Sequence, residues 1–373
     1  MSVFDEENEI SFYDGVPDNI RAKYDEWDSL VKRLTQKSEV KGLPRDATFE
    51  ITPLCNLSCK MCFIRLDKEK MDGIGKLMTT VQWTKIAKET AELGVLSILI
   101  TGGEPFLHPE FIDIYTNIAK LGFLITLYTN AVMLNDKIIE TLKKYPPNFL
   151  YITIYGSSEE TYEKLCGNGE AYNSVVNNIK IFKDIFKDIP INLRTTIVKE
   201  NIKDLDEIRE FAKQMQLKFT FGFGKIKPIR GAEYRDIEKS RLSPEEVVKM
   251  QESALNSKKF EKNLTDVNIQ KTNVTDDMKN LNCSAAKTTY TISWDGKMLP
   301  CQIFSSPYKL PLDIGIKNAW NELKNIRSTI KKPDRCINCK YKYYCGNCPA
   351  KIQAESGTYI DGESYKCMQQ SCK

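Results

Sequence analysis

Between residues 46 and 257, short apolar runs rich in β-branched residues alternate with amphipathic segments. This alternation is typical of a parallel sheet whose strands are joined by crossover helices. We count six such units and therefore predict an α/β fold built on a partial (β/α)6 barrel of the TIM type. The six predicted strands are residues 48–52, 96–101, 123–129, 150–155, 191–197 and 219–223.

The sequence on either side of this region has a different character. Residues 1–45 form an N-terminal extension that begins with an acidic segment and predicts a helix over residues 18–34. Residues 258–282 are polar and rich in Lys, Asn and Thr, which predicts a linker. Residues 283–373 have too little apolar periodicity to form a core alone, so we expect bound metal to stabilise a small C-terminal domain there. Within it, the apolar segments around Asp295-Gly296 predict a β-hairpin.

The charge of the chain is nearly balanced, with 54 Lys and Arg against 50 Asp and Glu and a formal net charge of +4. This balance argues against a nucleic-acid or membrane-surface partner. No apolar run approaches the roughly 20 residues that a membrane span requires, and the acidic N-terminus differs from a signal peptide. We therefore expect a cytoplasmic protein that binds neither nucleic acid nor membranes.

Eleven of the twelve cysteines fall into two groups. Cys55, Cys59 and Cys62 lie together, Cys166 is isolated, and the other eight lie between Cys283 and Cys372. In a compartment that keeps thiols reduced, such groups are metal ligands rather than a disulfide framework. The sequence therefore predicts two metal regions.

The first cysteine group follows the first predicted strand, at the carboxyl edge of the sheet, where (β/α) folds place their chemistry. Three thiolates on one short loop can hold three irons of a [4Fe-4S] cluster and leave the fourth iron without a protein ligand. The alternative is a helical stripe of buried cysteines, because offsets of four and seven residues also share one helical face. Pro53 and Asn56 favour a loop over that helix.

The pattern Cys55-x3-Cys59-x2-Cys62, followed by Phe63, resembles the signature of the radical S-adenosylmethionine (SAM) enzymes. The resemblance implies that SAM binds the open iron. It also implies that reductive cleavage of SAM gives a 5′-deoxyadenosyl radical, which abstracts a substrate hydrogen. The protein would supply positioning, electronic tuning and exclusion of side reactions.

Further positions resemble SAM contacts of that family. Gly102-Gly103-Glu104-Pro105 is similar to the motif that receives the SAM amino group, and its alternative is an ordinary strand-to-helix turn. Asn130 and Ser157 resemble residues that line the ribose, and their alternative is a turn or cap. Arg194 resembles the residue that pairs with the SAM carboxylate, which would give a buried guanidinium its partner. We expect His108, the sole histidine, to be structural.

The later cysteines resemble the SPASM extension, a C-terminal domain of radical SAM enzymes with two auxiliary iron-sulfur clusters. The resemblance implies two auxiliary [4Fe-4S] clusters, the second of them one ligand short. Either Cys372 or Cys166 fills that gap, or the iron stays open. A zinc site is the alternative, although the five residues between Cys339 and Cys345 are too few for the common zinc-ribbon spacing. The implied ligands are Cys336, Cys339, Cys345 and Cys367 for one cluster, and Cys283, Cys301 and Cys348 for the other.

The resemblance also implies a substrate class, because SPASM enzymes mostly modify ribosomally made peptides. We expect a peptide substrate with a leader sequence. Residues 1–45 would either contact that leader or cap the barrel. We also expect a reducing partner such as flavodoxin or ferredoxin.

An open auxiliary iron would hold a substrate thiolate beside the carbon radical, which favours a thioether crosslink. The alternatives are carbon-carbon crosslinking and epimerisation, with Cys166 or Cys372 as hydrogen donor. Outside this class, an iron-sulfur electron-transfer protein or a zinc-stapled binding module stays open.

Overall fold

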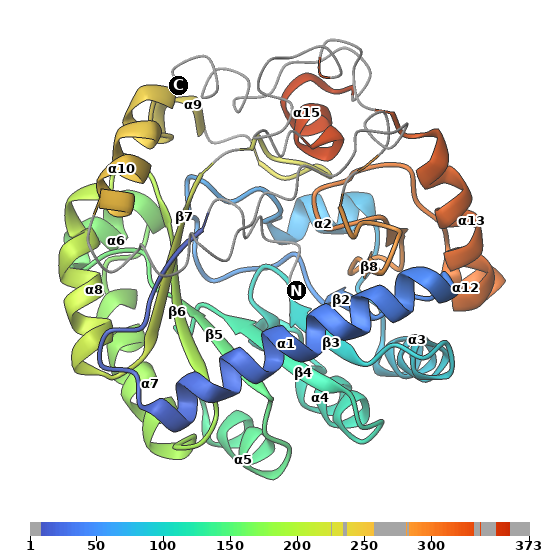
Figure 1. The fold of residues 1–373 in the computed structure, drawn as a ribbon, viewed down its shortest axis with the longest axis horizontal. Coiled ribbons are helices and arrows are strands. Elements are labelled where there is room, and N and C mark those ends of the chain that lie inside the picture. Colours follow the sequence, from blue (N-terminus) through green and yellow to red (C-terminus); the bar gives the residue numbers. More distant parts are fainter. Residues whose placement is uncertain are drawn as a thin grey trace.

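A single nine-stranded sheet organises the described part of the chain (Figure 1). The computed structural model describes residues 9–224, 226–233, 237–256, 281, 283–331, 336 and 348–358. Its strand order is β1-β7-β6-β5-β4-β3-β2-β8-β9, so the sheet curves into an open barrel. Most of the predicted linker 258–282 lies outside the described residues. Among those residues, no helix is both long and apolar enough to cross a bilayer.

The six predicted strands are confirmed, each within a few residues of its expected ends. They pair in parallel with their neighbours in the chain, as crossover helices require. The strands are β2 (Asp46–Glu50), β3 (Ser97–Thr101), β4 (Leu124–Thr129), β5 (Phe149–Thr153), β6 (Ile191–Ile197) and β7 (Lys218–Phe223).

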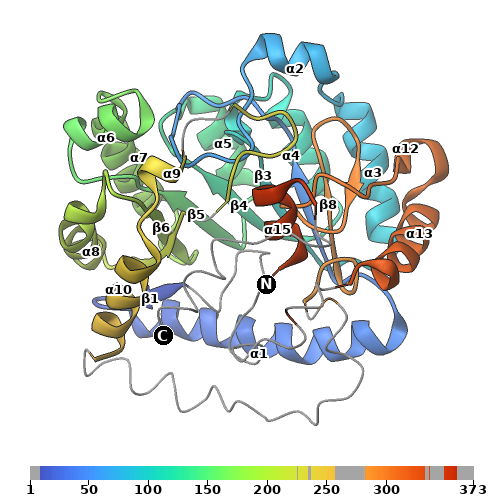
Figure 2. The same ribbon diagram turned by 90° about the horizontal axis from the view of Figure 1, so that it is seen from above.

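Helices cover the outer face of these strands (Figures 1 and 2). Alternate strand residues point outward into one large core, where Phe49 of β2 contacts Trp83 of α3 with ring centroids 5.1 Å apart. The intervening residues of each strand face the inside of the barrel and are often polar. The helices are α2 (Lys68–Ile74), α3 (Thr80–Glu92), α4 (Phe111–Ala119), α5 (Asp136–Lys144), α6 (Glu159–Cys166), α7 (Ala171–Ile185), α8 (Leu205–Gln214), α9 (Ile237–Ser240) and α10 (Pro244–Asn256), with short 3-10 turns η2 (Pro105–Leu107) and η3 (Ile202–Asp204).

Three further strands extend the sheet at both edges, and the sequence did not predict how they join the barrel strands. At one edge, β1 (Ile10–Phe12) pairs antiparallel with β7. At the other, β8 (Thr289–Ile292) pairs in parallel with β2. The predicted hairpin is confirmed, since β8 and β9 (Met298–Leu299) pair antiparallel around Asp295-Gly296, where Gly296 has φ of 83°. The C-terminal segment therefore continues the barrel sheet.

Helix α1 (Asp18–Lys41) crosses the amino end of the barrel (Figure 2). It is longer than the predicted helix and ends before Gly42, which adopts the left-handed conformation with φ of 62°. Tyr24 and Trp27 pack on Phe149, the first residue of β5, with ring centroids 5.8 and 5.2 Å apart. The helix thus closes the end of the barrel opposite the carboxyl edge.

The C-terminal helices pack beside the hairpin. They are α12 (Pro311–Ile314), α13 (Ile316–Thr329) and α15 (Pro349–Ser356). Trp320 of α13 is fully buried, lies against Tyr290 of β8, and donates a hydrogen bond of 3.0 Å to the Gly42 carbonyl. A separate small core contains Phe304, Ile330 and Ala350 around Cys301. So small a core agrees with the expectation that metal stabilises this segment.

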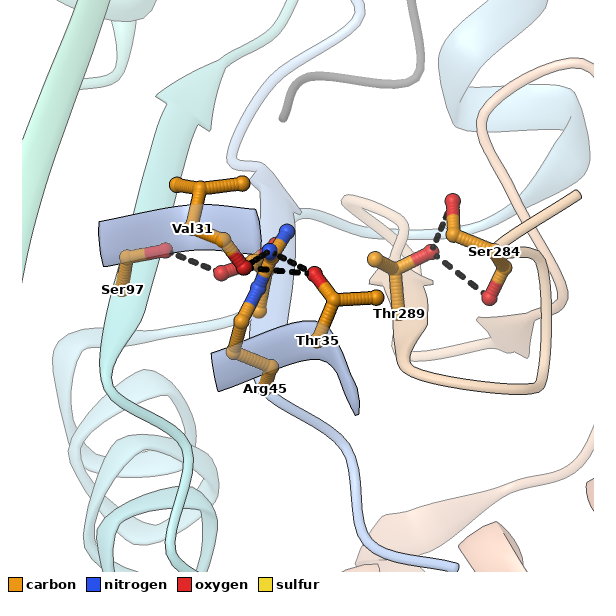
Figure 3. Close-up of polar contacts among 7 residues, drawn as sticks. Val31, Thr35, Arg45, Ser97, Ser284 and Thr289 are labelled. Atoms are coloured by element: carbon orange, nitrogen blue, oxygen red, sulfur yellow. Dashed lines mark hydrogen bonds and ion pairs between the residues drawn. The ribbon is translucent and has the colours of Figure 1, made fainter. Parts of the chain in front are cut away.

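A buried ion pair joins α1 to the first barrel strand (Figure 3). Arg45 donates from Nε to Asp46 Oδ2 at 2.8 Å and from Nη1 to the Val31 carbonyl at 3.0 Å, and it also contacts Thr35. Ser97 of β3 donates to the other Asp46 oxygen at 2.5 Å. In the same view, Thr289 donates to the Ser284 carbonyl at 3.2 Å, which fixes the turn after Cys283.

We expect Arg45→Met to lower the free energy of unfolding by about 3–5 kcal/mol, because it leaves the buried Asp46 carboxylate without its cation. The double variant Arg45→Met/Asp46→Leu should lose less of the free energy of unfolding, since it removes both charges. Urea unfolding of the variants measures this difference. As a control, Lys164→Met removes an exposed pair with Glu160 and should change stability by less than about 1 kcal/mol. A double variant less stable than Arg45→Met would contradict the prediction.

Candidate active site at the carboxyl edge of the barrel

The first cysteine group lies on a loop between β2 and α2, so the alternative of a helical stripe is wrong. The last turn of α6 holds this loop from one side. Ser58 donates its N–H to the Cys166 carbonyl at 2.8 Å, and Lys60 donates to the Leu165 carbonyl at 3.0 Å. The free carbonyls at a helix end are natural acceptors, so α6 fixes the loop on both sides of Cys59.

The three loop thiols lie in a largely buried environment. Cys59 is 4% exposed, while Cys55 and Cys62 are partly buried. The Asn130 amide and the Leu57 N–H each lie 3.4 Å from Cys55 Sγ as donors. Burial, followed by the nearby Cys59 thiol, raises the pKa of Cys55. The neighbouring Cys166 thiol, followed by burial, raises the pKa of Cys59. Metal binding at these sulfurs would therefore release protons.

These residues fit an iron-sulfur cluster better than a single metal ion. Within the described ranges, no three His, Cys, Asp or Glu side chains are grouped closely enough to hold one ion. A [4Fe-4S] cube is larger, and each of its thiolates binds a different iron, so its ligands lie farther apart. The donors near Cys55 Sγ also suit a metal-bound thiolate, which can only accept hydrogen bonds.

The glycine pair after β3 packs on the backbone of the cysteine loop. A Cβ at Gly102 would lie 2.4 Å from the Thr52 carbonyl oxygen, and one at Gly103 would lie 2.3 Å from the Leu54 oxygen. The backbone N–H groups of Gly103 and Glu104 donate to these same two oxygens at 2.7 and 2.8 Å. The turn is therefore glycine because its backbone touches the cysteine loop.

Glu104 is fully buried and lies where β3, β4 and the cysteine loop meet. Its Oε1 accepts hydrogen bonds from the Thr129 hydroxyl at 2.8 Å and the Phe106 N–H at 3.2 Å. Its Oε2 accepts from the Asn130 N–H at 2.7 Å. Burial raises the pKa of Glu104 to about 7, although these three hydrogen bonds oppose the shift.

Asn130 links the end of β4 to the cysteine loop. Besides its contact with Cys55, its side chain donates to Asn56 Oδ1 at 2.8 Å and accepts from the Val132 N–H at 3.0 Å. The structure therefore brings Asn130 together with Glu104 and the cysteines.

The remaining predicted contacts lie around this loop. Ser157 donates its N–H to Asp204 at 3.0 Å, while the cap of α6 is the next residue, Ser158. Pro105 is buried at the start of η2. The Phe63 carbonyl accepts the Ile229 N–H at 2.9 Å.

Arg194 has a partner that the sequence did not reveal. Its guanidinium pairs with Glu9, just before β1, and donates to the Tyr128 hydroxyl at 3.1 Å. It also lies over the rings of Tyr128 and Tyr151, at 5.6 and 5.3 Å from their centroids. Burial disfavours its charge, but Tyr128 and Glu9 outweigh burial and raise the pKa of Arg194. No local pattern marks Glu9, because β1 and β6 are far apart in the chain.

His108 has a backbone partner at each ring nitrogen. The Glu110 N–H donates to Nδ1 at 3.1 Å, so Nε2 carries the proton and donates to the Met78 carbonyl at 3.2 Å. Burial lowers the pKa of His108 and favours this neutral form. The expected structural role is confirmed.

A second set of cysteines gathers in the C-terminal segment. Burial, followed by the nearby Cys348 and Cys283 thiols, raises the pKa of Cys301, while Cys283 itself is exposed. Cys336 is described and partly buried. Cys166 is fully buried beside Cys59 and thus belongs with the first loop. Cys339, Cys345, Cys367 and Cys372 lie outside the described residues.

Residues 49–212 match the Radical SAM superfamily. This range runs from β2 to α8 and contains the cysteine loop, Glu104, Asn130 and Arg194. Residues 49–212 therefore form a radical SAM domain, which indicates that the protein is an enzyme.

Three similar proteins show how far the likeness extends. An AdoMet-dependent heme synthase of Methanosarcina barkeri is 23% identical over 86% of this chain and 96% of its own length. The antilisterial bacteriocin subtilosin biosynthesis protein AlbA of Bacillus subtilis is 23% identical over 85% of this chain and 70% of its own. The structure of Streptococcus suis SuiB bound to precursor peptide SuiA has a TM-score of 0.65 at 18% identity, covering 89% of this chain and 79% of that one. The structural likeness thus spans most of the fold.

We expect Gly103→Ala to destabilise the protein by at least about 2 kcal/mol and to lower its iron content. The added methyl group would overlap backbone atoms of the cysteine loop, which cannot rotate away as a side chain can. Gly73→Ala in α2 is the control, since no atom lies within 4 Å of its Cβ position. That change should be neutral or stabilising by up to about 1 kcal/mol. Thermal unfolding and iron analysis after reconstitution measure both effects. Wild-type iron content in Gly103→Ala would refute the role of the contact.

We expect the Glu104 carboxyl of SAM-free protein to titrate near pH 7. Because its folded pKa lies above the ordinary 4.5, its stabilising contribution is complete below pH 4.5 and is lost as pH rises through 7. The loss amounts to about 3 kcal/mol. Infrared difference spectra between pH 5.5 and 8.5, wild type against Glu104→Gln, would show the carboxylic acid band and its midpoint. A midpoint near 4.5 would contradict this assignment.

Proposed function

We propose that this enzyme uses radical SAM chemistry to modify a ribosomally made peptide, with a thioether crosslink as the favoured product. The observation that carries the SAM part is the cysteine loop, held against Glu104 and Asn130 at the carboxyl edge of the barrel. Cys55, Cys59 and Cys62 would hold one [4Fe-4S] cluster with an open iron. With SAM bound, this cluster supplies the one-electron chemistry that removes a hydrogen atom from a substrate carbon.

The residues around the loop would orient SAM. Glu104 offers a buried carboxylate for the amino group, and its raised pKa means that a cationic partner would stabilise its charged form. Asn130 and Ser157 would line the ribose. Arg194 pairs with the Glu9 carboxylate, and we propose that the SAM carboxylate takes the place of Glu9 there. In the same family pattern, Phe63, Gly102, Gly103 and Pro105 complete the SAM site.

The second cysteine group supports the peptide part of the proposal. Cys283, Cys301 and Cys348 lie together, and the exposure of Cys283 suits an auxiliary cluster that a substrate thiolate can reach. Cys336, Cys339, Cys345 and Cys367 would hold the other auxiliary cluster. We therefore propose a SPASM domain at 283–373, after a linker at 258–282 and a radical SAM domain at 46–257.

The named relatives support a peptide substrate. AlbA takes part in bacteriocin biosynthesis, and SuiB was solved with a precursor peptide. We propose that residues 1–45, which include α1, cap the barrel and contact the leader of such a peptide. A flavodoxin or ferredoxin would supply electrons, and we propose a cytoplasmic location, where thiols stay reduced.

A second candidate comes from the heme synthase, because the likeness covers 96% of that enzyme. In that case the substrate would be a tetrapyrrole, with the same SAM site. The exposed Cys283 favours the peptide candidate, because an auxiliary cluster there would have a direct use in holding a substrate thiolate.

We expect anaerobically reconstituted wild type to form 5′-deoxyadenosine from SAM and dithionite, as detected by mass spectrometry. The variant Cys55→Ala/Cys59→Ala/Cys62→Ala should form none and should lose about four of about twelve irons, because only the first cluster is removed. A short Cys-containing precursor peptide should stimulate wild-type turnover and lose two hydrogen atoms when the thioether forms.

Three outcomes would count against this proposal. A colourless, zinc-loaded wild type would end it. A wild-type iron content that corresponds to a single cluster would rule out the auxiliary clusters. Stimulation by a tetrapyrrole but by no peptide would select the second candidate instead.

A further inference from the structure

The segment that follows β7 contacts the cysteine loop. We call its described residues, 226–233 and 237–242, the bridge. Within it, the Ile229 N–H donates to the Phe63 carbonyl at 2.9 Å. Phe63 directly follows the last cysteine of the loop, so the bridge is attached to the loop at that end.

A second contact joins the bridge to the cysteine loop through Glu200. Its Oε1 accepts hydrogen bonds from Ser240 Oγ at 2.8 Å and from Lys60 Nζ at 3.0 Å. Ser240 is the last residue of α9 in the bridge, and Lys60 directly follows Cys59. The bridge is thus connected to the loop on both sides of Cys62.

Arg230 of the bridge connects the end of β2 with the turn that contains Cys301. Its guanidinium donates to the two Glu50 oxygens at 2.6 and 2.9 Å and to the Gln302 carbonyl at 3.0 Å. Glu50 is the last residue of β2 and is buried. Arg230 has φ of 52°, in the left-handed region that residues with a Cβ rarely adopt. Such a backbone persists only where surrounding contacts hold it, and these three hydrogen bonds are such contacts.

Arg241 of the bridge holds helix α15. Its Nη1 donates to the two Glu355 oxygens at 3.0 and 3.2 Å, and the Lys227 N–H donates to Glu355 Oε1 at 3.2 Å. The Arg241 and Glu355 side chains are only 11% and 8% exposed, so solvent screens this ion pair little. Helix α15 begins directly after Cys348, which packs on the small core around Cys301. The bridge therefore holds the segments of two C-terminal cysteines.

The separation of the two cysteine groups matters for a thioether crosslink. The substrate thiolate would be held at the C-terminal group, whereas the carbon radical would form beside the SAM-site cluster. A bond forms only when the two reacting atoms lie close together, and a small misplacement costs much of the rate. A rigid connection between the two groups would therefore serve the reaction.

We propose that Arg230 and Arg241 are positioning residues that hold the C-terminal cysteine group at a fixed separation from the cysteine loop. This inference rests on the proposed function, since that function gives each cysteine group a cluster. Both arginines act through hydrogen bonds and ion pairs alone, and neither changes its charge or its covalent state.

The test is pulsed electron paramagnetic resonance of reconstituted, dithionite-reduced protein, which measures the distances between the SAM-site cluster and the auxiliary clusters. The wild type should give narrow distance distributions. Arg230→Met/Glu50→Leu and Arg241→Met/Glu355→Gln should each broaden at least one distribution, because the Cys301 turn or α15 can then move relative to the barrel. Both variants also remove the partner charge, so neither leaves an unpaired buried charge that would prevent folding.

Arg45→Met/Asp46→Leu is the matched control. It removes the other buried ion pair of β2, whose side chains contact α1 and β3. Its distance distributions should equal those of the wild type. All three double variants should keep the wild-type iron content, because every cysteine is present.

Four outcomes would count against the proposal. Equal broadening in the control would overturn it, since the loss of any buried ion pair would then explain the effect. Unchanged distributions in both arginine variants would overturn it too. Loss of auxiliary iron from these variants would do the same, because the arginines would then be needed to assemble a cluster rather than to place it. Broadening in only one arginine variant would overturn the role of the other arginine.

The proposed function can fail separately from this inference. A wild type with iron for a single cluster refutes the auxiliary clusters and, with them, the role of the arginines. A wild type that holds the auxiliary clusters and cleaves SAM, but whose cluster distances do not change in the arginine variants, refutes only that role.

Discussion

The site depends on a contact between two backbones. Strands β2 and β3 are in parallel register, with Glu50 opposite Thr101, so the loops that follow them begin side by side. The Gly102-Gly103 turn then packs on Thr52 and Leu54 at distances that exclude any Cβ. Because this contact fixes both the cysteine loop and Glu104, it sets the geometry of every other group at the carboxyl edge.

The buried charges around the barrel interior differ in their partners. Glu50 is paired with Arg230, which donates to its two oxygens at 2.6 and 2.9 Å and to the Gln302 carbonyl at 3.0 Å. Arg194 is paired with Glu9. The three donors to Glu104 are neutral, and its pKa rises toward 7, as expected for a buried carboxylate with no cationic partner among the described residues. Of these groups, Glu104 gains most from a cationic ligand, which agrees with an amino group binding there.

The local parts of this arrangement could be predicted from the sequence, whereas the pairing of distant segments could not. The six strands, the Asp295-Gly296 hairpin and the cysteine loop follow from periodicity, turn residues and spacing, which act over a few positions. The sequence also indicated that Arg194 needs an anionic partner. It did not identify Glu9, the pairing of β8 with β2, or the place of Cys166 beside Cys59, because these contacts depend on how the sheet closes at its edges and on where α6 ends.

Both edges of the sheet add residues from outside the region that matches the superfamily. The region that matches the superfamily, residues 49–212, contains the cysteine loop and its polar contacts. Segments outside it supply Glu9 at one edge, and Arg230 with the Cys283, Cys301 and Cys348 group at the other. Because Arg230 holds both Glu50 and the residue after Cys301, the C-terminal cysteines are tied directly to the strand that leads into the cysteine loop. Changes in the flanking segments can thus alter what approaches the SAM site while the contact between the Gly102-Gly103 turn and the cysteine loop stays in place.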